Sequence, residues 1–183
     1  NGGTGSARDY FMASSYGKFV PEFDVVGPYN LPKSIASYGA NDEDGYDIDP
    51  AAMIVDACAA ANTAGLDFTQ YDTDNDGVLD NVFVYYAGYN EAEGAAENTV
   101  WPHRWAVYTS EESATNYTYD GTIASVTFDG KRLYDYACTS ELSGSAGSTM
   151  CGIGTFCHEF GHVIGMPDYY NTDDSNKNTL DEW

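Results

Sequence analysis

Two of the three histidines in the chain lie four residues apart, in the segment His158-Glu159-Phe160-Gly161-His162. On a helix, residues four apart are separated by about 40° in azimuth and about 6 Å along the axis, so both imidazoles can reach one tetrahedral metal ion. Glu159 lies on the flank of that face, where it can accept a proton from a metal-bound water. The pattern therefore predicts a catalytic zinc site.

The residues after the second histidine supply a third ligand. Gly165 follows His162 by three residues and can end the helix in the left-handed conformation, which reverses the chain. The reversal would bring Asp168 back to the histidines, and three protein ligands plus a water make the open, catalytic form of a zinc site. The alternative is that Asp168 is an ordinary turn residue at the end of the helix.

A second group of candidate ligands lies in an acidic segment. Carboxylates occupy positions 1, 3, 5 and 9 of a calcium-loop pattern, namely Asp72, Asp74, Asp76 and Asp80. Gly77 takes the sharp-turn position, and the carbonyl of Val78 would serve position 7. Position 12 is Phe83, which excludes a full EF-hand, so the bidentate ligand is Asp80 or comes from another segment. The alternative is a solvated acidic turn without an ion.

Helices and strands that alternate along the chain must position these groups. We expect helices over 7–16, 51–64 and 155–164, with Asp49 as N-cap of the second and Gly165 ending the third. Strands are expected over 19–26 and over 81–87, and the second is apolar enough to be central in its sheet. Residues 123–128 and 132–137 form a hairpin that turns at Asp129-Gly130. This order predicts a layered α/β domain.

The segment from His158 to Tyr170 resembles the zinc segment of the immune inhibitor A (M6) metalloproteases, a metzincin-like family. Shorter stretches are similar in the same order, namely Ser14–Phe19, Asp72–Val84, Tyr86–Tyr89 and Trp101–Trp105. The resemblance implies that His158, His162 and Asp168 bind zinc, and that Glu159 is the general base. It also implies a metzincin-like α/β domain, a mixed sheet packed on helices that include the zinc-binding helix, from a secreted enzyme that cleaves proteins.

The last residues differ from the family pattern. The family continues beyond its aspartate into a turn whose methionine forms a floor beneath the metal ligands. Here the chain stops at 180–183, where that turn would begin, and Met150 and Met166 lie in the wrong places to replace it. We therefore expect residues 1–183 to be a metalloprotease catalytic domain that ends before this Met-turn and lacks the C-terminal lower subdomain.

Composition limits the function further. The chain has 183 residues and a net charge of −22, which would repel the phosphates of nucleic acids at every contact. No apolar run approaches the roughly 18 residues of a membrane-spanning helix. Bound divalent cations would reduce the repulsion among these negative charges. Secreted proteins that work in calcium-containing media often have a composition of this kind. Four cysteines allow one or two disulfides in an oxidising compartment, or free thiols.

These features predict a secreted zinc endopeptidase with a structural calcium ion and a protein or peptide substrate. Glu159 would accept the proton of the attacking water and later donate it to the leaving amine. Tyr169, Tyr170 and His103 are candidates for a second group that stabilises the oxyanion. An extended substrate would add to an edge of the sheet. The alternatives are a calcium-stabilised, non-catalytic binding module derived from a protease, and a zinc amidase that acts on small molecules or cell-wall peptides.

Overall fold

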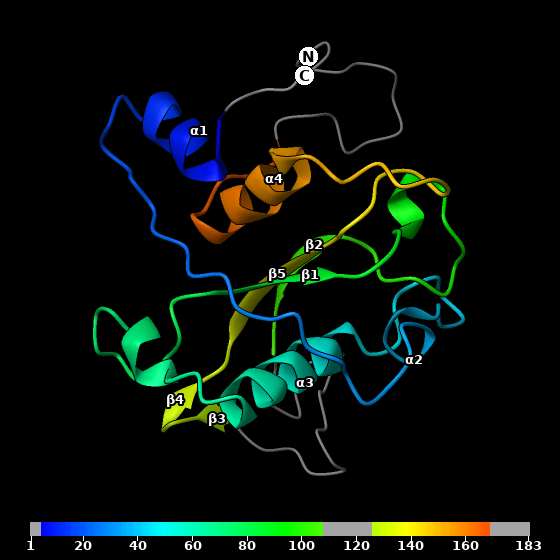
Figure 1. The fold of residues 1–183 in the computed structure, drawn as a ribbon, viewed down its shortest axis with the longest axis horizontal. Coiled ribbons are helices and arrows are strands. Elements are labelled where there is room, and N and C mark those ends of the chain that lie inside the picture. Colours follow the sequence, from blue (N-terminus) through cyan, green and yellow to red (C-terminus); the bar gives the residue numbers. More distant parts are fainter. Residues whose placement is uncertain (1–4, 108–125, 169–183) are drawn as a thin grey trace.

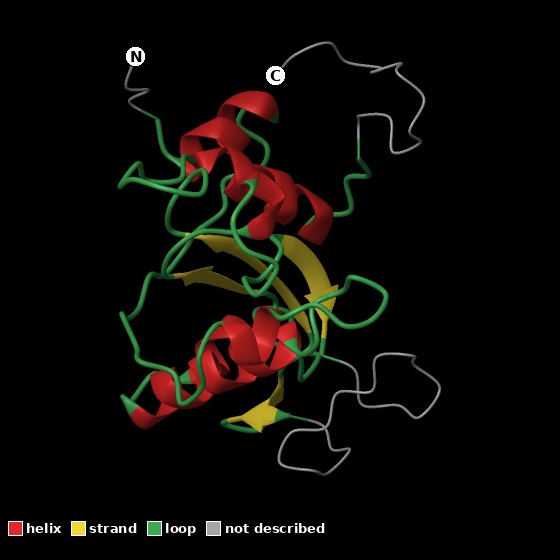
Figure 2. Ribbon diagram, turned by 90° about the vertical axis from the view of Figure 1, so that its right-hand side faces the viewer, coloured by secondary structure: helices red, strands yellow, loops and turns green. Residues whose placement is uncertain are grey.

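The computed structural model describes residues 5–107 and 126–168. A three-stranded sheet lies between two layers of helices, with α1 and α4 on one face and α3 on the other (Figures 1 and 2). This arrangement confirms the predicted α/β class. The elements in chain order are α1 Ala7–Ser14, α2 Ala36–Gly39, α3 Pro50–Thr63, η1 Phe68–Tyr71, β1 Val82–Tyr86, η2 Glu91–Glu93, β2 His103–Ala106, β3 Thr127–Phe128, β4 Lys131–Arg132, β5 Asp135–Ser140 and α4 Ile153–Val163.

The central strand of the sheet is β5, not β1. The strand order is β1-β5-β2, with β1 parallel and β2 antiparallel to β5. The prediction that 81–87 is central was therefore wrong for the described sheet. The reason lies in β5, whose sequence Asp-Tyr-Ala-Cys-Thr-Ser mixes small and polar residues and carries little apolar signal, although residues 136–140 are fully buried.

β1 is apolar along its whole length because helices cover both of its faces. Val82 and Val84 pack against the buried core that includes α3. Phe83 and Tyr85 point to the other face, where their ring centroids lie 4.4 and 6.0 Å from that of Phe156 in α4. The strand thus anchors the helix that carries the histidines.

The three predicted helices are confirmed as α1, α3 and α4. α1 begins with a capping box, in which the Asp9 N–H donates to Ser6 Oγ and the Ser6 N–H donates to the Asp9 carboxylate. α3 begins at Pro50, but the side chain of the predicted N-cap Asp49 makes no capping hydrogen bond. In the described ranges, no helix combines the length and apolar character needed to cross a bilayer.

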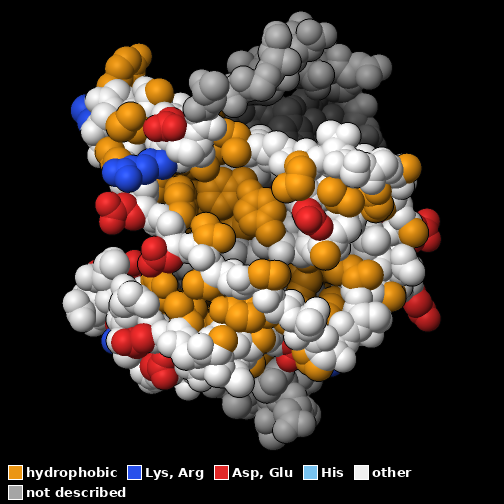
Figure 3. Space-filling view, viewed as in Figure 1, with side chains coloured by type: hydrophobic (Ala, Val, Ile, Leu, Met, Phe, Trp, Pro, Cys, Tyr) orange, Lys and Arg blue, Asp and Glu red, His pale blue; other side chains and the backbone are white. Residues whose placement is uncertain are grey.

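The predicted strand over 19–26 is wrong, because these residues join no sheet. Their aromatic side chains cover α4 instead, and the ring centroids of Phe19 and Phe23 lie 6.4 and 5.1 Å from that of Phe160. Phe11 of α1 completes this contact at 5.4 Å from Phe160. Apolar side chains gather on this side of the molecule, between the α1 and α4 layer and α3 (Figure 3).

The predicted hairpin turn is confirmed, but the hairpin strands are only the short β3 and β4, and residues 135–137 belong to β5 of the three-stranded sheet. Asp129 and Gly130 both have positive φ, 51° and 78°, as a type I′ turn requires, and they join β3 to β4. The first residues of the predicted hairpin, 123–125, lie outside the described residues. The four cysteines, Cys58, Cys138, Cys151 and Cys157, are unpaired, so the structure contains none of the disulfides considered from the sequence.

Candidate metal centre

α4 places the two histidines of the motif one turn apart on the same side of the helix. The Nε2 atoms of His158 and His162 lie 3.2 Å apart, and the ring planes are inclined at 80°. The spacing therefore brings both imidazoles to one point, as helix geometry predicts.

A chain reversal after α4 adds the third predicted ligand. Gly165 has a φ of 87°, its N–H donates to the His162 carbonyl, and the Met166 N–H donates to the Gly161 carbonyl. This pair of bonds is the Schellman motif, which ends a helix and turns the chain back. Asp168 Oδ1 consequently lies 3.4 Å from His158 Nε2 and 3.2 Å from His162 Nε2.

The protonation of the imidazoles suits metal binding. His162 Nδ1 lies 2.8 Å from the Met166 carbonyl oxygen, which can only accept a hydrogen bond. Nδ1 therefore carries the proton, and the lone pair of Nε2 faces His158 and Asp168. Burial, and then the neighbouring His162, lower the pKa of His158, which favours the neutral imidazole that ligates metals.

These residues fit a zinc ion. Two imidazole nitrogens and one carboxylate oxygen converge, each within 3.4 Å of the other two. Two histidines and a carboxylate form a known donor set of catalytic zinc sites, in which a water takes the fourth position.

Glu159 lies beside this point and is almost completely buried, with a residue exposure of 6%. Its Oε1 lies 3.9 Å from His158 Nε2. Burial raises the pKa of Glu159 to about 7. A carboxyl group with a pKa near neutrality can both accept and return a proton, which is the property that a general base needs.

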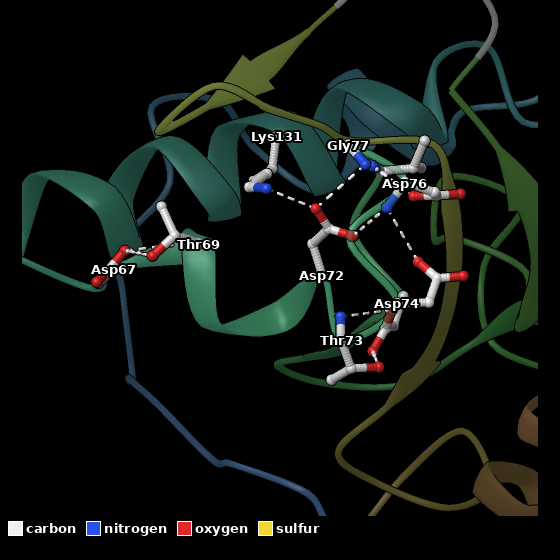
Figure 4. Close-up of polar contacts among 10 residues, drawn as sticks. Asp67, Thr69, Asp72, Thr73, Asp74, Asp76, Gly77 and Lys131 are labelled. Atoms are coloured by element: carbon white, nitrogen blue, oxygen red, sulfur yellow. Dashed lines mark hydrogen bonds and ion pairs between the residues drawn. The ribbon is translucent and has the colours of Figure 1, made fainter.

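The acidic segment forms a compact loop around Asp72 (Figure 4). Ligand oxygens of Asp72, Asp74 and Asp80 lie within 4.8 Å of one another. The buried Asp72 carboxylate accepts the N–H groups of Asp76 and Gly77, at 3.0 and 3.1 Å. The carboxylate of Asp76 lies outside this group of three, and it accepts the N–H of the predicted carbonyl ligand Val78 at 2.8 Å.

An open cavity of about 280 Å³ adjoins this loop. Its lining is mostly carboxylate and consists of Asp74, Asp76, Val78, Leu79, Asp80 and Asp135. A basic side chain already reaches the other side of the loop, since Lys131 Nζ lies 2.5 Å from Asp72 Oδ2. The Lys131 ammonium holds the pKa of the Asp72 carboxyl below its usual value.

Sequence reasoning missed the residues that join these sites to the rest of the fold. They are Arg104, Lys131 and Asp135, together with the Met166 carbonyl. The partners of Arg104, Lys131 and Asp135 lie 31 to 59 residues away along the chain, so no local spacing signals them. The contact of Met166 with His162 is local, but it is made by a backbone carbonyl, which no residue type marks. Of the oxyanion candidates, Tyr169 and Tyr170 lie outside the described residues.

The third oxyanion candidate, His103, is engaged inside the sheet. Its Nδ1 lies 2.6 Å from the Trp101 carbonyl, and its Nε2 lies 2.9 Å from the Tyr136 hydroxyl. Both ring nitrogens are therefore occupied by the protein, and neither remains for a substrate oxygen.

The structure has a mixed sheet and a helix that carries a histidine pair, with a neighbouring glutamate and a returning aspartate. These features agree with the family of peptidases that the sequence matches. The chain belongs to the M6 peptidase family, whose model "Immune inhibitor A peptidase M6, catalytic domain" matches residues 1–183.

Two curated relatives resemble the chain over most of its length. Immune inhibitor A of Bacillus thuringiensis subsp. alesti is 28% identical over 186 residues, which cover 91% of this chain and 26% of that protein. Pre-pro-metalloprotease PrtV of Vibrio cholerae serotype O1 is 24% identical over 188 residues, 91% of this chain and 19% of that protein. The chain thus spans about a quarter or less of the length of each relative.

Proposed function

We propose that the chain is the catalytic domain of a secreted, zinc-dependent endopeptidase that hydrolyses protein substrates. The observation that carries the proposal is the convergence of His158, His162 and Asp168 beside the buried Glu159. Membership of a peptidase family and the name of the metalloprotease relative support it. The strongly negative charge, −22, suits an extracellular medium that contains divalent cations.

His158, His162 and Asp168 would hold the zinc ion. When bound there, zinc supplies Lewis-acid chemistry, because it polarises a carbonyl and lowers the pKa of water. Glu159 takes the proton of the attacking water on its carboxylate and returns that proton to the leaving amine. Burial restricts the movement of this carboxylate and keeps it beside the ligands for both transfers.

The substrate would lie along the edge of β2. In the described sheet, β2 pairs only with β5, and α4 contacts both strands. Because α4 carries both histidines and Glu159, its contact with β2 brings this strand near the metal ligands. An extended peptide that pairs with β2 would gain main-chain hydrogen bonds and pass directly by Glu159.

The acidic loop would bind a structural calcium ion. The grouped oxygens of Asp72, Asp74 and Asp80 and the carboxylate-lined cavity support this proposal, because calcium prefers oxygen ligands. From the sequence pattern, Asp76 and the Val78 carbonyl would complete the set. Calorimetry tests the proposal: we expect calcium binding that Asp74→Ala weakens, and absence of calcium heat would contradict it.

Proteolysis assays test the zinc proposal. The protein, expressed with its natural flanking sequence, should contain zinc, cleave casein, lose activity with 1,10-phenanthroline and regain it on zinc addition. Absence of bound zinc together with failure to cleave any protein would contradict the proposal. Cleavage limited to short amides would favour a zinc amidase, and calcium binding without any hydrolysis would favour a non-catalytic module.

A further inference from the structure

The outer edge of β2, the edge that faces away from β5, can be described residue by residue. The Val107 N–H donates to the Tyr134 carbonyl at 2.7 Å. This bond continues the antiparallel register in which Ala106 lies opposite Asp135. Hydrogen-bonded and non-hydrogen-bonded positions alternate in such a pair. The backbone N–H and C=O of Trp105 therefore point towards β5, whereas those of Ala106 point to the outer edge.

The register also shows to which face of the sheet each side chain of β2 belongs. Ala137 of β5 lies opposite both Arg104 of β2 and Phe83 of β1, so these three side chains share a face. The ring of Phe83 lies 4.4 Å from that of Phe156 in α4. This is therefore the face that α4 covers, and the neighbouring Trp105 lies on the other one.

Trp105 presents a large, half-exposed apolar side chain on that other face. It is 48% exposed, whereas the next residue, Ala106, is 6% exposed. Its neighbours on this face are fixed. Tyr136, directly opposite, is fully buried, and its hydroxyl lies 2.9 Å from His103 Nε2. His103 Nδ1 in turn lies 2.6 Å from the Trp101 carbonyl. The exposed indole thus lies beside side chains that are already held in place.

An extended peptide that adds to the outer edge in antiparallel orientation would bond the backbone of Ala106 and place one residue opposite Trp105. That residue would occupy a non-hydrogen-bonded pair, the position at which cross-strand side chains lie closest. Its side chain would point to the same face as the indole, and the side chains on either side of it would point towards α4. Aromatic and large aliphatic side chains form the most favourable cross-strand pairs with an aromatic ring.

We propose that Trp105 is a specificity-determining residue, which binds an aromatic or large aliphatic side chain of the substrate at the position opposite it on the outer edge of β2. The inference rests on the proposed peptidase function and names the kind of side chain that one substrate position takes. This side chain points away from the face that carries the metal ligands. Loss of the indole should therefore weaken substrate binding more than it slows the chemical step.

Peptide binding tests the inference without hydrolysis. The probes are a peptide in which phenylalanine alternates with threonine, so that all its phenylalanines share one face, and a peptide in which alanine replaces each phenylalanine. Metal-free protein with its natural flanking sequence should bind the phenylalanine peptide about two- to tenfold more tightly, as expected for one aromatic pair. Trp105→Ala should abolish this preference, and Trp105→Phe should keep most of it. Tyr46→Ala, which truncates another exposed aromatic residue, is the control and should leave it unchanged.

Nuclear magnetic resonance of the wild type gives a readout that needs no variant. The phenylalanine peptide should shift the indole N–H resonance of Trp105 and the amide resonance of Ala106. Unchanged resonances, equal affinity for the two peptides, or binding of neither peptide would each overturn the inference. A preference that survives in Trp105→Ala would overturn it as well.

Mapping of cleavage sites in casein tests the consequence for the zinc-loaded enzyme. Aromatic and large aliphatic residues should be enriched at one fixed distance from the cut, and Trp105→Ala should lose that enrichment, with KM raised more than kcat is lowered. If the wild type cleaves nothing with zinc present, the peptidase proposal fails, and the binding experiments alone decide the role of Trp105. If the wild type is active and Trp105→Ala keeps the same cleavage profile, the specificity role is wrong.

Discussion

The histidine–aspartate group on α4 and the carboxylate group of the acidic loop differ in what faces their ligand atoms. On α4, the ligand atoms face one another, with both His Nε2 atoms within 3.4 Å of Asp168 Oδ1. In the loop, the protein supplies its own cation, because Lys131 lies 2.5 Å from Asp72. Under the proposed function, the first group would depend on an ion, whereas the second can fold without one and would gain stability if calcium binds.

The largest expected effect is that of Glu159→Gln. An amide cannot accept the proton of the attacking water, so kcat should fall about 10²- to 10⁴-fold. Zinc should remain bound because Glu159 is not one of the proposed ligands. Casein cleavage and metal analysis check both statements, with exposed Glu97→Gln as the control. Activity close to that of the control would remove Glu159 from the mechanism, and loss of zinc would make it a ligand.

The next effect concerns the third ligand. Asp168→Asn should weaken zinc binding by at least about 10- to 100-fold, the range found when residues that support metal ligands are changed. Asparagine is as acceptable as aspartate in a turn, so the substitution separates the two interpretations of this residue. Zinc titration against a competing chelator measures the effect. An affinity equal to that of Asp44→Asn would show that Asp168 is only a turn residue.

The two regions also show how much of the candidate sites could be predicted from the sequence. The α4 group follows from a local rule: a helix places residues four apart on one face, and Gly165 turns the chain back. The positions of His158, His162 and Asp168 could therefore be expected before the structure was known. The loop pattern likewise pointed to a group of carboxylates, of which Asp72, Asp74 and Asp80 lie together. The carboxylate of Asp76 accepts the Val78 N–H, and Asp76 also lines the adjoining cavity.

Contacts between distant segments could not be predicted in this way. Lys131 follows its partner Asp72 by 59 residues, and Arg104 and Asp135 are 31 apart. The central strand β5 was missed for a related reason, because its burial comes from the layers on either side and not from an apolar sequence of its own. The aromatic residues of 19–26 looked strand-like, but they pack onto α4 instead of joining a ladder.

A smaller effect is expected at the lysine of the loop. Lys131→Met should strengthen calcium binding about tenfold, because a unit charge in contact with the ligand group opposes a divalent ion by on the order of 1–2 kcal/mol even in a water-like medium. Without calcium, the variant should melt at a lower temperature, because the carboxylates then lose their counter-ion. Calorimetry and thermal melting with calcium or a chelator measure the two effects.

Lys18→Met is the matched control for this prediction. It removes one positive charge at an exposed position after α1, and so it changes the net charge equally. If both variants bind calcium alike, the overall charge of the protein sets the affinity, and the ion pair with Asp72 does not. If neither the wild type nor the variants bind calcium, the calcium proposal itself is wrong.

The smallest effect is expected at Asp47, a partly buried carboxyl group. Its negative charge is removed by protonation and, within the described residues, is not balanced by a neighbouring cation, as that of Asp72 is. Asp47 Oδ2 accepts the Trp101 N–H at 3.0 Å, and its Oδ1 is buried without a hydrogen-bond partner among the described residues. Burial, and to a smaller extent the charge of Glu91, raise the pKa of Asp47 to about 6. The ionised carboxylate therefore costs stability at neutral pH, and the native state takes up a proton before the unfolded chain does as pH falls.

Asp47→Asn should consequently stabilise the protein at pH 7 by about 1 kcal/mol, less than the full pKa shift implies because the carboxyl is only partly buried. The sign follows from the raised pKa: the penalty is present above about pH 6 and disappears as pH falls towards about 4, the value for an unfolded aspartate. Urea unfolding of wild type and variant at pH 7 and pH 4.5 measures the difference, which should shrink at the lower pH. Exposed Asp44→Asn should show no such change, and an Asp47→Asn difference that is independent of pH would mean that the hydrogen bonds of the new amide, and not charge, set its stability.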